Sequence, residues 1–207
     1  MPGASRRGRF ITLEGVDGAG KSTHIPWIAE RLRAGGREVV VTREPGGTPL
    51  AEKLRARVLT EKMDPVEETR LMFEARGDHV KALIAPALAR GACVLCDRFT
   101  DSTIAYQGAG KGVPRELIDE LARKIHPGLK PDLTLVFDTS YAVSSQRLAA
   151  SGRALDKFEA EGSGFFDRVR QAYRELARAE PDRIRLIDGS KPLEQVKAEI
   201  EKGIASL

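Results

Sequence analysis

One stretch of nine residues combines three glycines with a lysine and two hydroxyl side chains, a set suited to holding phosphate groups. It reads Gly15, Val16, Asp17, Gly18, Ala19, Gly20, Lys21, Ser22, Thr23 and matches the pattern G-x-x-x-x-G-K-[ST]. Glycines let successive backbone N–H groups turn toward phosphate oxygens, and a helix that begins here adds the positive end of its dipole. Lys21 would bring a positive charge to the outer phosphates, and the Ser22 hydroxyl is placed to hold Mg²⁺. The spacing therefore predicts a nucleoside triphosphate site.

The elements around this stretch fit a strand, a loop and a helix in succession. An apolar run at 10–13 precedes the glycines, and a helical pattern follows them to about residue 33. Four more apolar runs, of the kind found in parallel strands, lie at 38–42, 93–96, 133–137 and 184–187. We expect helices between them at 49–59, 65–89, 102–106, 114–125, up to 150, 165–179 and 193–204, with the glycines of 108–112 breaking the helical pattern.

Strands that alternate with helices predict an α/β fold with right-handed crossovers. We therefore expect the three-layer P-loop NTPase fold, with a five-stranded parallel sheet flanked by helices. Ligands of such sheets bind beyond the carboxyl ends of the strands. Gly15, Arg43, Asp97 and the loop after Asp138 all fall at that edge.

Length and composition predict one domain. The chain has 207 residues, of which 31% are charged, 41% hydrophobic and 5% aromatic, values that suit a cytoplasmic enzyme. The net charge of +4 suits anionic substrates but is too small to predict a nucleic-acid partner. No apolar run approaches the length that spans a membrane, and the start lacks the apolar core of a signal peptide. We expect residues 1–8 to form a loose tail and 9–207 to form the domain.

The two cysteines, Cys93 and Cys96, stand in a C-x-x-C pattern that invites a redox or metal-binding interpretation. They belong to a predicted buried strand, however, and residues three apart on a strand point to opposite faces. We therefore expect two separate core cysteines. The three histidines are scattered, and none has a partner at a spacing typical of metal ligands.

A phosphate loop alone is shared by motors, switches and kinases. The guanine-reading Asn-Lys-x-Asp of a GTPase switch is excluded, because the sequence contains no asparagine. Small size, one phosphate loop and several arginines in predicted loops favour phosphoryl transfer to a small phosphorylated acceptor. Two alternatives stay open at this point: a nucleoside monophosphate kinase of another base preference, and a P-loop ATPase module that needs no acceptor.

Five blocks in this order carry a resemblance that spans residues 9–207. They are Glu14-Gly15-Val16-Asp17-Gly18-Ala19-Gly20-Lys21-Ser22-Thr23, Thr42-Arg43-Glu44-Pro45-Gly46-Gly47-Thr48, Asp97-Arg98-Phe99, Ala105-Tyr106-Gln107-Gly108 and Pro131-Asp132-Leu133-Thr134. Together they resemble the bacterial thymidylate kinases. The resemblance implies transfer of the ATP γ-phosphoryl group to dTMP, which gives dTDP and ADP. It also implies Mg²⁺ bound with ATP, and a homodimer.

The resemblance assigns a catalytic set of Lys21, Arg98, Asp17, Arg153 and Lys157. Arg98 matches the arginine that bridges donor and acceptor phosphates, a role that suits its planar fork. Asp97 matches an aspartate near the water shell of Mg²⁺, so Ser22 and Asp97 form the predicted metal set. The acceptor is a phosphate monoester with a second pKa near about 6, so its oxygen is already anionic and needs no strong general base. Catalysis then depends mainly on cations and on positioning the donor and acceptor phosphates.

The predicted dTMP-binding set consists of Asp17, Glu44, Arg55, Met72, Phe73, Arg76, Arg98, Ser102, Tyr106 and Gln107. By the resemblance, Arg76 reads thymine O4, and Ser102 and Gln107 complete the base edge. Tyr106 would lie against the deoxyribose, where a 2′-hydroxyl would clash. The aromatic residue that the family places over thymine corresponds to Met72, with Phe73 beside it, and either could cover the ring.

The segment 151–162 resembles the lid of the family and adds a short lid to the expected fold. Some family members carry an arginine directly after the aspartate of the phosphate loop, where this chain has Gly18. The sequence therefore resembles the class whose lid supplies the cation, here Arg153 or Lys157. On the donor side, the resemblance places adenine near Arg147 and the segment 188–192, so Arg147 joins residues 15–23 in the predicted ATP-binding set.

Overall fold

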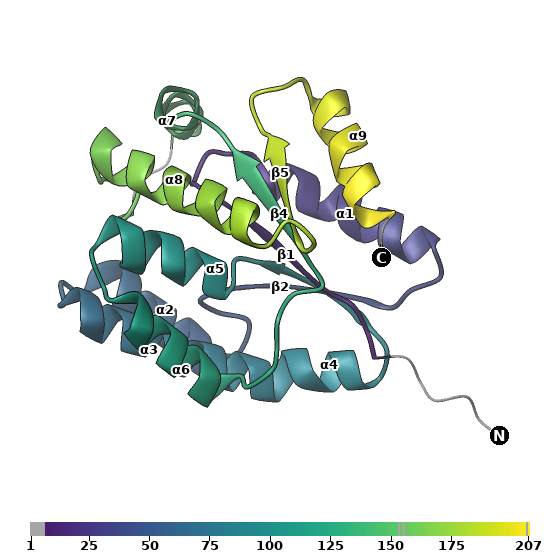
Figure 1. Ribbon diagram of the computed structural model, residues 1–207, viewed down its shortest axis with the longest axis horizontal. Helices are drawn as coiled ribbons and strands as arrows, with labels where there is room; N and C mark the ends of the chain where they lie inside the picture. The colour runs from purple at the N-terminus through teal and green to yellow at the C-terminus, as the bar shows by residue number, and fades with distance from the viewer. Residues whose placement is uncertain (1–6, 153, 155, 206) are drawn as a thin grey trace.

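The sheet places the phosphate loop at its centre. In the computed structural model, which describes residues 7–152, 154, 156–205 and 207, five parallel strands lie in the order β2-β3-β1-β4-β5 (Figure 1). Their bounds are β1 Phe10–Gly15, β2 Val39–Arg43, β3 Cys93–Asp97, β4 Leu133–Asp138 and β5 Ile184–Asp188. The five-stranded parallel sheet predicted from the sequence is confirmed. Because β1 is the central strand, the loop after it has neighbours on both sides.

The helices connect the strands and cover both faces of the sheet. Their bounds are α1 Lys21–Ala34, α2 Pro49–Thr60, α3 Pro65–His79, α4 Ala85–Ala89, α5 Thr100–Thr103, α6 Arg115–Ile125, α7 Tyr141–Ala150, α8 Ser163–Ala179 and α9 Leu193–Ile204, with π-helical segments η1 Val80–Ile84 and η2 Ile104–Gly110. Helices α1 and α9 lie together against one face, and α4, α5 and α8 pack on the other (Figure 1). None of the helices in the described part of the chain is long and apolar enough to cross a membrane.

The alternation of side chains along β3 separates the two cysteines as predicted. Cys93 packs in the cluster that contains Ile28 and Leu32 of α1, whereas Cys96 packs with Leu88 of α4 on the opposite face. Both thiols are free and buried. Burial raises the pKa of Cys93 to about 11 and that of Cys96 well above its ordinary value. These are inert core thiols.

Two stretches differ from the sequence-based expectation. The predicted strand at 38–42 is apolar, but β2 is an edge strand, and its Val41 is 43% exposed. The predicted break at 108–112 is also misplaced, because the backbone stays helical through Gly110 as η2. A Cβ at Gly110 would lie 2.5 Å from the Phe165 ring, so this glycine allows α8 to pack closely. The signal interpreted as a turn is a packing contact.

The start of α2 follows the expected capping chemistry. Thr48 has extended backbone angles, and its Oγ1 accepts a hydrogen bond of 3.2 Å from the Ala51 N–H. Of the predicted tail at 1–8, residues 1–6 lie outside the described residues.

Candidate active site

The loop between β1 and α1 turns its backbone toward a position that a phosphate could occupy. Helix α1 begins at Lys21 without a hydrogen bond from a described capping side chain, which leaves its first N–H groups for a ligand. Lys21 is buried, and its Nζ donates to the carbonyl oxygens of Gly15 and Val16 at 3.0 and 3.3 Å. Burial, with the nearby charge of Arg98, lowers the pKa of Lys21. The lysine is thus held along the inside of the loop.

Gly18 marks the closest approach of the loop to α7. Its φ of 78° lies in the left-handed region, and a Cβ at this position would lie 2.4 Å from the backbone oxygen of Ser144. Any side chain at position 18 would therefore both strain the loop and displace the helix backbone.

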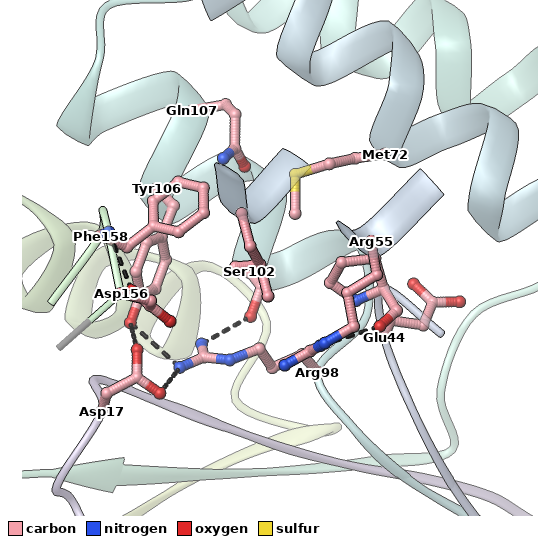
Figure 2. A pocket seen from close by; sticks show the side chains of 12 residues that line it. Asp17, Glu44, Arg55, Met72, Arg98, Ser102, Tyr106, Gln107, Asp156 and Phe158 are labelled. Atoms are coloured by element: carbon pink, nitrogen blue, oxygen red, sulfur yellow. Dashed lines mark hydrogen bonds and ion pairs between the residues drawn. The ribbon is translucent and has the colours of Figure 1, made fainter. Parts of the chain in front are cut away.

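A cavity that we call the central pocket opens beside the loop (Figure 2). Its lining consists of Asp17, Glu44, Pro45, Arg55, Leu59, Met72, Arg98, Ser102, Tyr106, Gln107, Asp156 and Phe158. All of the predicted dTMP-binding residues except Phe73 and Arg76 are thus brought together here. Pro45, Leu59, Asp156 and Phe158 were not singled out from the sequence, although the last two lie in the predicted lid.

Arg98 joins the phosphate loop to the central pocket. It is the one non-glycine residue in the described part of the chain with a positive φ, 73°, a backbone conformation typical of functional positions. Its Nη2 donates to Asp17 Oδ1 at 2.8 Å and to the Tyr106 hydroxyl at 3.1 Å, and its Nη1 donates to Ser102 Oγ at 3.1 Å (Figure 2). Burial alone would raise the pKa of Asp17, but the charges of Arg98 and Lys21 outweigh it and hold this pKa below its ordinary value.

A fully buried carboxylate, Glu14, holds the turn that presents Arg98. Its Oε1 accepts a 2.7 Å hydrogen bond from the Phe99 N–H, and its Oε2 accepts from the hydroxyls of Ser102 and Tyr173. Burial, with the charge of Asp101, raises the pKa of Glu14 to about 7. The sequence motif contains Glu14, but nothing local in the sequence predicts this role.

Arg76 lies at the wall of a smaller cavity, the side pocket, which adjoins the central pocket. The side pocket is lined by Glu44, Pro45, Met72, Arg76, Arg98, Phe99 and Ser102. Arg76 Nε donates to Glu44 Oε2 at 2.6 Å, and Nη2 donates to Thr103 Oγ1 at 3.1 Å. Nη1 is buried and has no hydrogen-bond partner among the described residues. A buried donor without a partner is costly, so this nitrogen suits an acceptor atom of a ligand.

Glu44 fixes Arg76 from behind. Its Oε1 pairs with His79 Nδ1 at 3.0 Å, so that both carboxylate oxygens have partners. Burial alone would raise the pKa of Glu44, but Arg76 and His79 lower it overall. The carboxylate therefore stays ionised beside the guanidinium.

The structure separates Met72 from Phe73. Met72 lines both the central and the side pocket. Phe73 lines neither, since it is buried with Val113 and Ile118, with its ring centroid 4.6 Å from the guanidinium carbon of Arg76. Adjacent residues on a helix point about 100° apart, so only one of the two can face the cavity. Phe73 supports Arg76 from the core.

Gln107 and Arg55 also have fixed positions in the central pocket. The Gln107 Nε2 donates to Glu68 at 3.0 Å, whereas Oε1 is buried and lacks a partner in the described part of the chain. Arg55 Nη1 donates to the Pro45 carbonyl oxygen at 2.9 Å (Figure 2). Its remaining guanidinium nitrogens can still reach an anion in the pocket.

The predicted lid residues are only partly placed. Arg153 lies outside the described residues. Lys157 is described, but the structure does not bring it to the phosphate loop, because its Nζ pairs with Glu68 at 2.7 Å and donates to the Glu61 carbonyl oxygen at 3.2 Å. Phe158 and Asp156, on either side of Lys157, line the central pocket instead.

The predicted metal residues offer a small donor set. Asp97 Oδ1 is buried without a hydrogen-bond partner among the described residues, and Ser22 is exposed at the start of α1. Within the described residues there is no cluster of three or more His, Cys, Asp or Glu side chains that could hold a metal. Mg²⁺ keeps several of its waters and takes few protein ligands, so one carboxylate and one hydroxyl fit it.

Another cavity, the outer pocket, lies where the phosphate loop meets α1. It is lined by Ala19, Gly20, Thr23, His24, Arg147, Gly189, Lys191, Leu193 and Val196. Arg147 Nη2 donates to the Gly189 carbonyl oxygen at 2.9 Å, and Nη1 donates to that of Gly18 at 3.4 Å. The structure therefore brings together Arg147 and the segment 188–192, as the sequence indicated. His24, which the sequence did not single out, has a buried Nδ1 with no partner among the described residues.

Comparisons with known proteins agree with one another. A family model described as thymidylate kinase matches residues 13–200. A protein named thymidylate kinase from Methylobacillus flagellatus is 56% identical over 194 residues, which cover 94% of this chain and 95% of that protein. The thymidylate kinase of Bordetella pertussis is 54% identical over 201 residues, 97% of this chain and 96% of its own. A crystal structure of thymidylate kinase from Ehrlichia chaffeensis superposes with a TM-score of 0.77 at 33% identity, and the match covers 96% of this chain and 99% of that one.

Proposed function

Because the chain belongs to the thymidylate kinase family, we propose how its residues divide the work of the family reaction. The reaction transfers the γ-phosphoryl group of ATP to dTMP and gives dTDP and ADP, a step of nucleotide biosynthesis. Neither a kinase of other base preference nor an acceptor-independent ATPase finds support in the comparisons. The observation that carries the residue roles is the pair of unpartnered polar atoms, Arg76 Nη1 and Gln107 Oε1, beside the phosphate loop.

These two atoms match the edge of thymine. Thymine presents an acceptor at O4 next to a donor at N3–H, so Arg76 would donate to O4 and Gln107 would accept from N3–H. Cytosine presents the opposite pattern and would leave both protein atoms unpaired. A site built in this way rejects the wrong base because its own buried groups lose their partners. Ser102 completes this edge, and Met72 covers the ring.

The sugar and phosphate of dTMP would extend from the base toward the phosphate loop. Tyr106 would pack against the deoxyribose, so that an added 2′-hydroxyl meets its ring. Asp17 and Glu44 bound the site with acceptors, while Arg55 and Arg98 would bind the acceptor phosphate. An arginine fork suits a phosphate because two N–H groups can bond two oxygens.

Catalysis would then consist of bringing two polyanions together. Arg98 would bridge the acceptor phosphate and the transferred group, and Lys21 would hold the outer phosphates of ATP along the loop of residues 15–23. A lid cation, Arg153 or Lys157, would complete the charge over the transferred group, and Lys157 must leave Glu68 to do so. Arg147 and the outer pocket would hold adenine. We propose 9–207 as one domain with 151–162 as its lid.

Ser22 and Asp97 would hold Mg²⁺, Ser22 directly and Asp97 through its water shell. When bound, Mg²⁺ neutralises charge on the phosphates of ATP. ATP affinity should fall when divalent ions are removed, and it should fall by a smaller amount in Asp97→Asn. Both results would support this assignment. We further propose a homodimer in the cytoplasm. A monomeric mass in analytical ultracentrifugation, or a membrane-bound pool in cell fractions, would contradict it.

An assay of ADP release with each common nucleoside monophosphate tests the roles at the base and sugar. We expect dTMP to be preferred over dUMP, because the lost methyl group costs about 1–3 kcal/mol, and strongly over UMP and dCMP. Equal kcat/KM for dTMP and UMP would contradict the role of Tyr106. ADP release that does not depend on an acceptor would contradict the whole scheme.

A further inference from the structure

The carboxylate of Glu68 is almost completely buried, at 1% exposure, yet no role described so far uses it. It lies on α3 and receives hydrogen bonds from three other segments. Gln107 of η2 donates at 3.0 Å, Lys111 after η2 donates to both oxygens at 2.8 and 2.9 Å, and Lys157 of the lid pairs with it at 2.7 Å. One buried carboxylate thus joins a side chain of the central pocket to the lid.

The charge state of Glu68 settles the orientation of the Gln107 amide. Burial alone would raise the pKa of Glu68, but hydrogen bonds from Lys111, Lys157 and Gln107 outweigh it and lower this pKa. An ionised carboxylate only accepts hydrogen bonds. Gln107 must therefore turn its NH₂ group toward Glu68, which leaves its carbonyl oxygen for the pocket, and Figure 2 shows the amide pointing into the space between Tyr106 and Met72.

The two ends of an amide side chain have nearly the same shape, so only the hydrogen-bond partners decide which end faces a ligand. We propose that Glu68 is a positioning residue for base selection: it fixes the Gln107 carbonyl toward the base, where it accepts N3–H of thymine. This inference rests on the proposed role of Gln107. With the amide reversed, the pocket would present a donor, which matches N3 of cytosine.

The lid takes part in the same arrangement. Phe158, next to Lys157, lines the central pocket, and the Nζ atoms of Lys111 and Lys157 lie 4.4 and 5.3 Å from its ring centroid. While Lys157 is paired with Glu68, the carboxylate that orients Gln107 also holds Phe158 beside the pocket, and this contact ends if Lys157 leaves Glu68 for the transferred group. The carboxylate of Glu68 therefore contacts both the side chain proposed to read the base and the lid residue next to Phe158.

The substitution Glu68→Gln tests the proposal, because it keeps the side-chain shape but adds a donor and lets the Gln107 amide reverse. We expect the ratio of kcat/KM for dTMP to that for dCMP to fall by about 10-fold or more, in line with one lost hydrogen bond and one unpaired donor. Glu67→Gln, the same change at the exposed neighbouring residue, should leave the ratio unchanged. An unchanged ratio in folded Glu68→Gln protein, verified by its melting curve, would overturn the proposal.

Two further measurements separate this inference from the proposed function. Gln107→Leu should lower kcat/KM for dTMP, and if it does not, the proposed role of Gln107 fails. If it does, but Glu68→Gln leaves the ratio intact, only the role of Glu68 fails. Should Glu68→Gln not fold, the wild-type enzyme can be assayed with 3-deaza-dTMP, which carries C–H in place of N3–H. We expect kcat/KM for this analogue to be at least about 10-fold below that for dTMP. Equal values, together with a loss in Gln107→Leu, would overturn the carbonyl orientation.

Discussion

The donor and acceptor sides of this kinase differ in whether backbone groups or side chains face the ligand. On the donor side, the phosphate loop presents mainly backbone groups, and even Lys21 and Arg147 are held by carbonyl oxygens. On the acceptor side, side chains face the pocket, and buried glutamates hold three groups from behind, whereas Arg55 donates to the Pro45 carbonyl oxygen. Glu14, Glu44 and Glu68 hold, respectively, the turn of Arg98, the guanidinium of Arg76 and the amide of Gln107.

The difference follows from what each side must recognise. Phosphates are alike in every nucleoside triphosphate, so a loop of N–H groups suffices to bind them. A pyrimidine base presents a specific pattern of donors and acceptors, and reading it requires side chains whose orientation is fixed. Glu44 and Glu68 supply that orientation because an ionised carboxylate accepts hydrogen bonds in defined directions.

The largest effect is expected where the two sides meet. Arg98→Met removes the cation that pairs with Asp17 and that we propose to bind the acceptor phosphate. We expect kcat to fall by about 10³-fold or more, as for arginines that stabilise phosphoryl transfer. Saturating steady-state assays with ATP and dTMP measure it, and Arg98→Lys controls for charge. A loss below about tenfold would mean that Arg98 is structural.

The lid cation provides the matched test from the other side. The double substitution of Arg153 and Lys157 by Ala should also lower kcat by orders of magnitude. If this variant keeps the wild-type kcat, the charge over the transferred group comes from elsewhere.

A third prediction concerns the boundary between the pocket and the core behind it. Phe73→Ala should lower the free energy of unfolding by about 3–5 kcal/mol, because it removes a buried ring. Met72→Ala should instead raise the KM for dTMP and leave the KM for ATP nearly unchanged. Denaturant titration and steady-state kinetics of both variants distinguish the two outcomes. A large rise in KM for dTMP in Phe73→Ala with normal stability would reverse the assignment.

The fourth prediction concerns the pH dependence that Glu14 contributes to stability. Because its pKa is raised from 4.5 to about 7, folded protein keeps a proton on Glu14 that unfolded chains release in this pH window. Stability from this group therefore falls as pH rises through the window, by up to about 3 kcal/mol.

Glu14→Gln removes this titration, so its stability relative to wild type should increase between about pH 5 and pH 8. Urea titrations at both pH values measure the difference, and Glu67→Gln provides an exposed control. A difference that is independent of pH would show that Glu14 keeps its charge in the folded protein.

The sequence predicted the phosphate loop from local spacing alone, whereas Arg147 and the segment 188–192 came from the family resemblance. A strand, the phosphate loop and a helix follow one another directly in the sequence. Their arrangement therefore does not depend on the order of the strands in the sheet. The acceptor residues, Glu44 among them, came from the family resemblance, but the support that Glu44, Glu14 and Glu68 give to their neighbours did not emerge from the sequence. Glu44 and Arg76 are 32 residues apart, and Glu68 and Gln107 are 39 apart, so no helical or strand period connects them.

The resemblance also named both Met72 and Phe73, and only the helix geometry distinguishes them. Similarly, Lys157 has the charge that a lid cation requires, but its pairing with Glu68 depends on how the segment 156–158 lies against α3. The sequence could not show this because the partner lies 89 positions away, outside any local pattern. The prediction of a break in the helix near Gly110 was wrong for the same reason, since the role of this glycine is set by Phe165 on another helix.

The contact between Gly18 and α7 constrains how this enzyme can evolve. If the lid supplies the catalytic charge as we propose, an arginine at position 18 would move its source to the loop in a single codon change. The carbonyl oxygen of Ser144 blocks that path, because even a methyl group at position 18 would overlap it. Relocating the charge would first require α7 to shift, and each intermediate would need to stay folded. We therefore expect the lid, rather than position 18, to supply this charge.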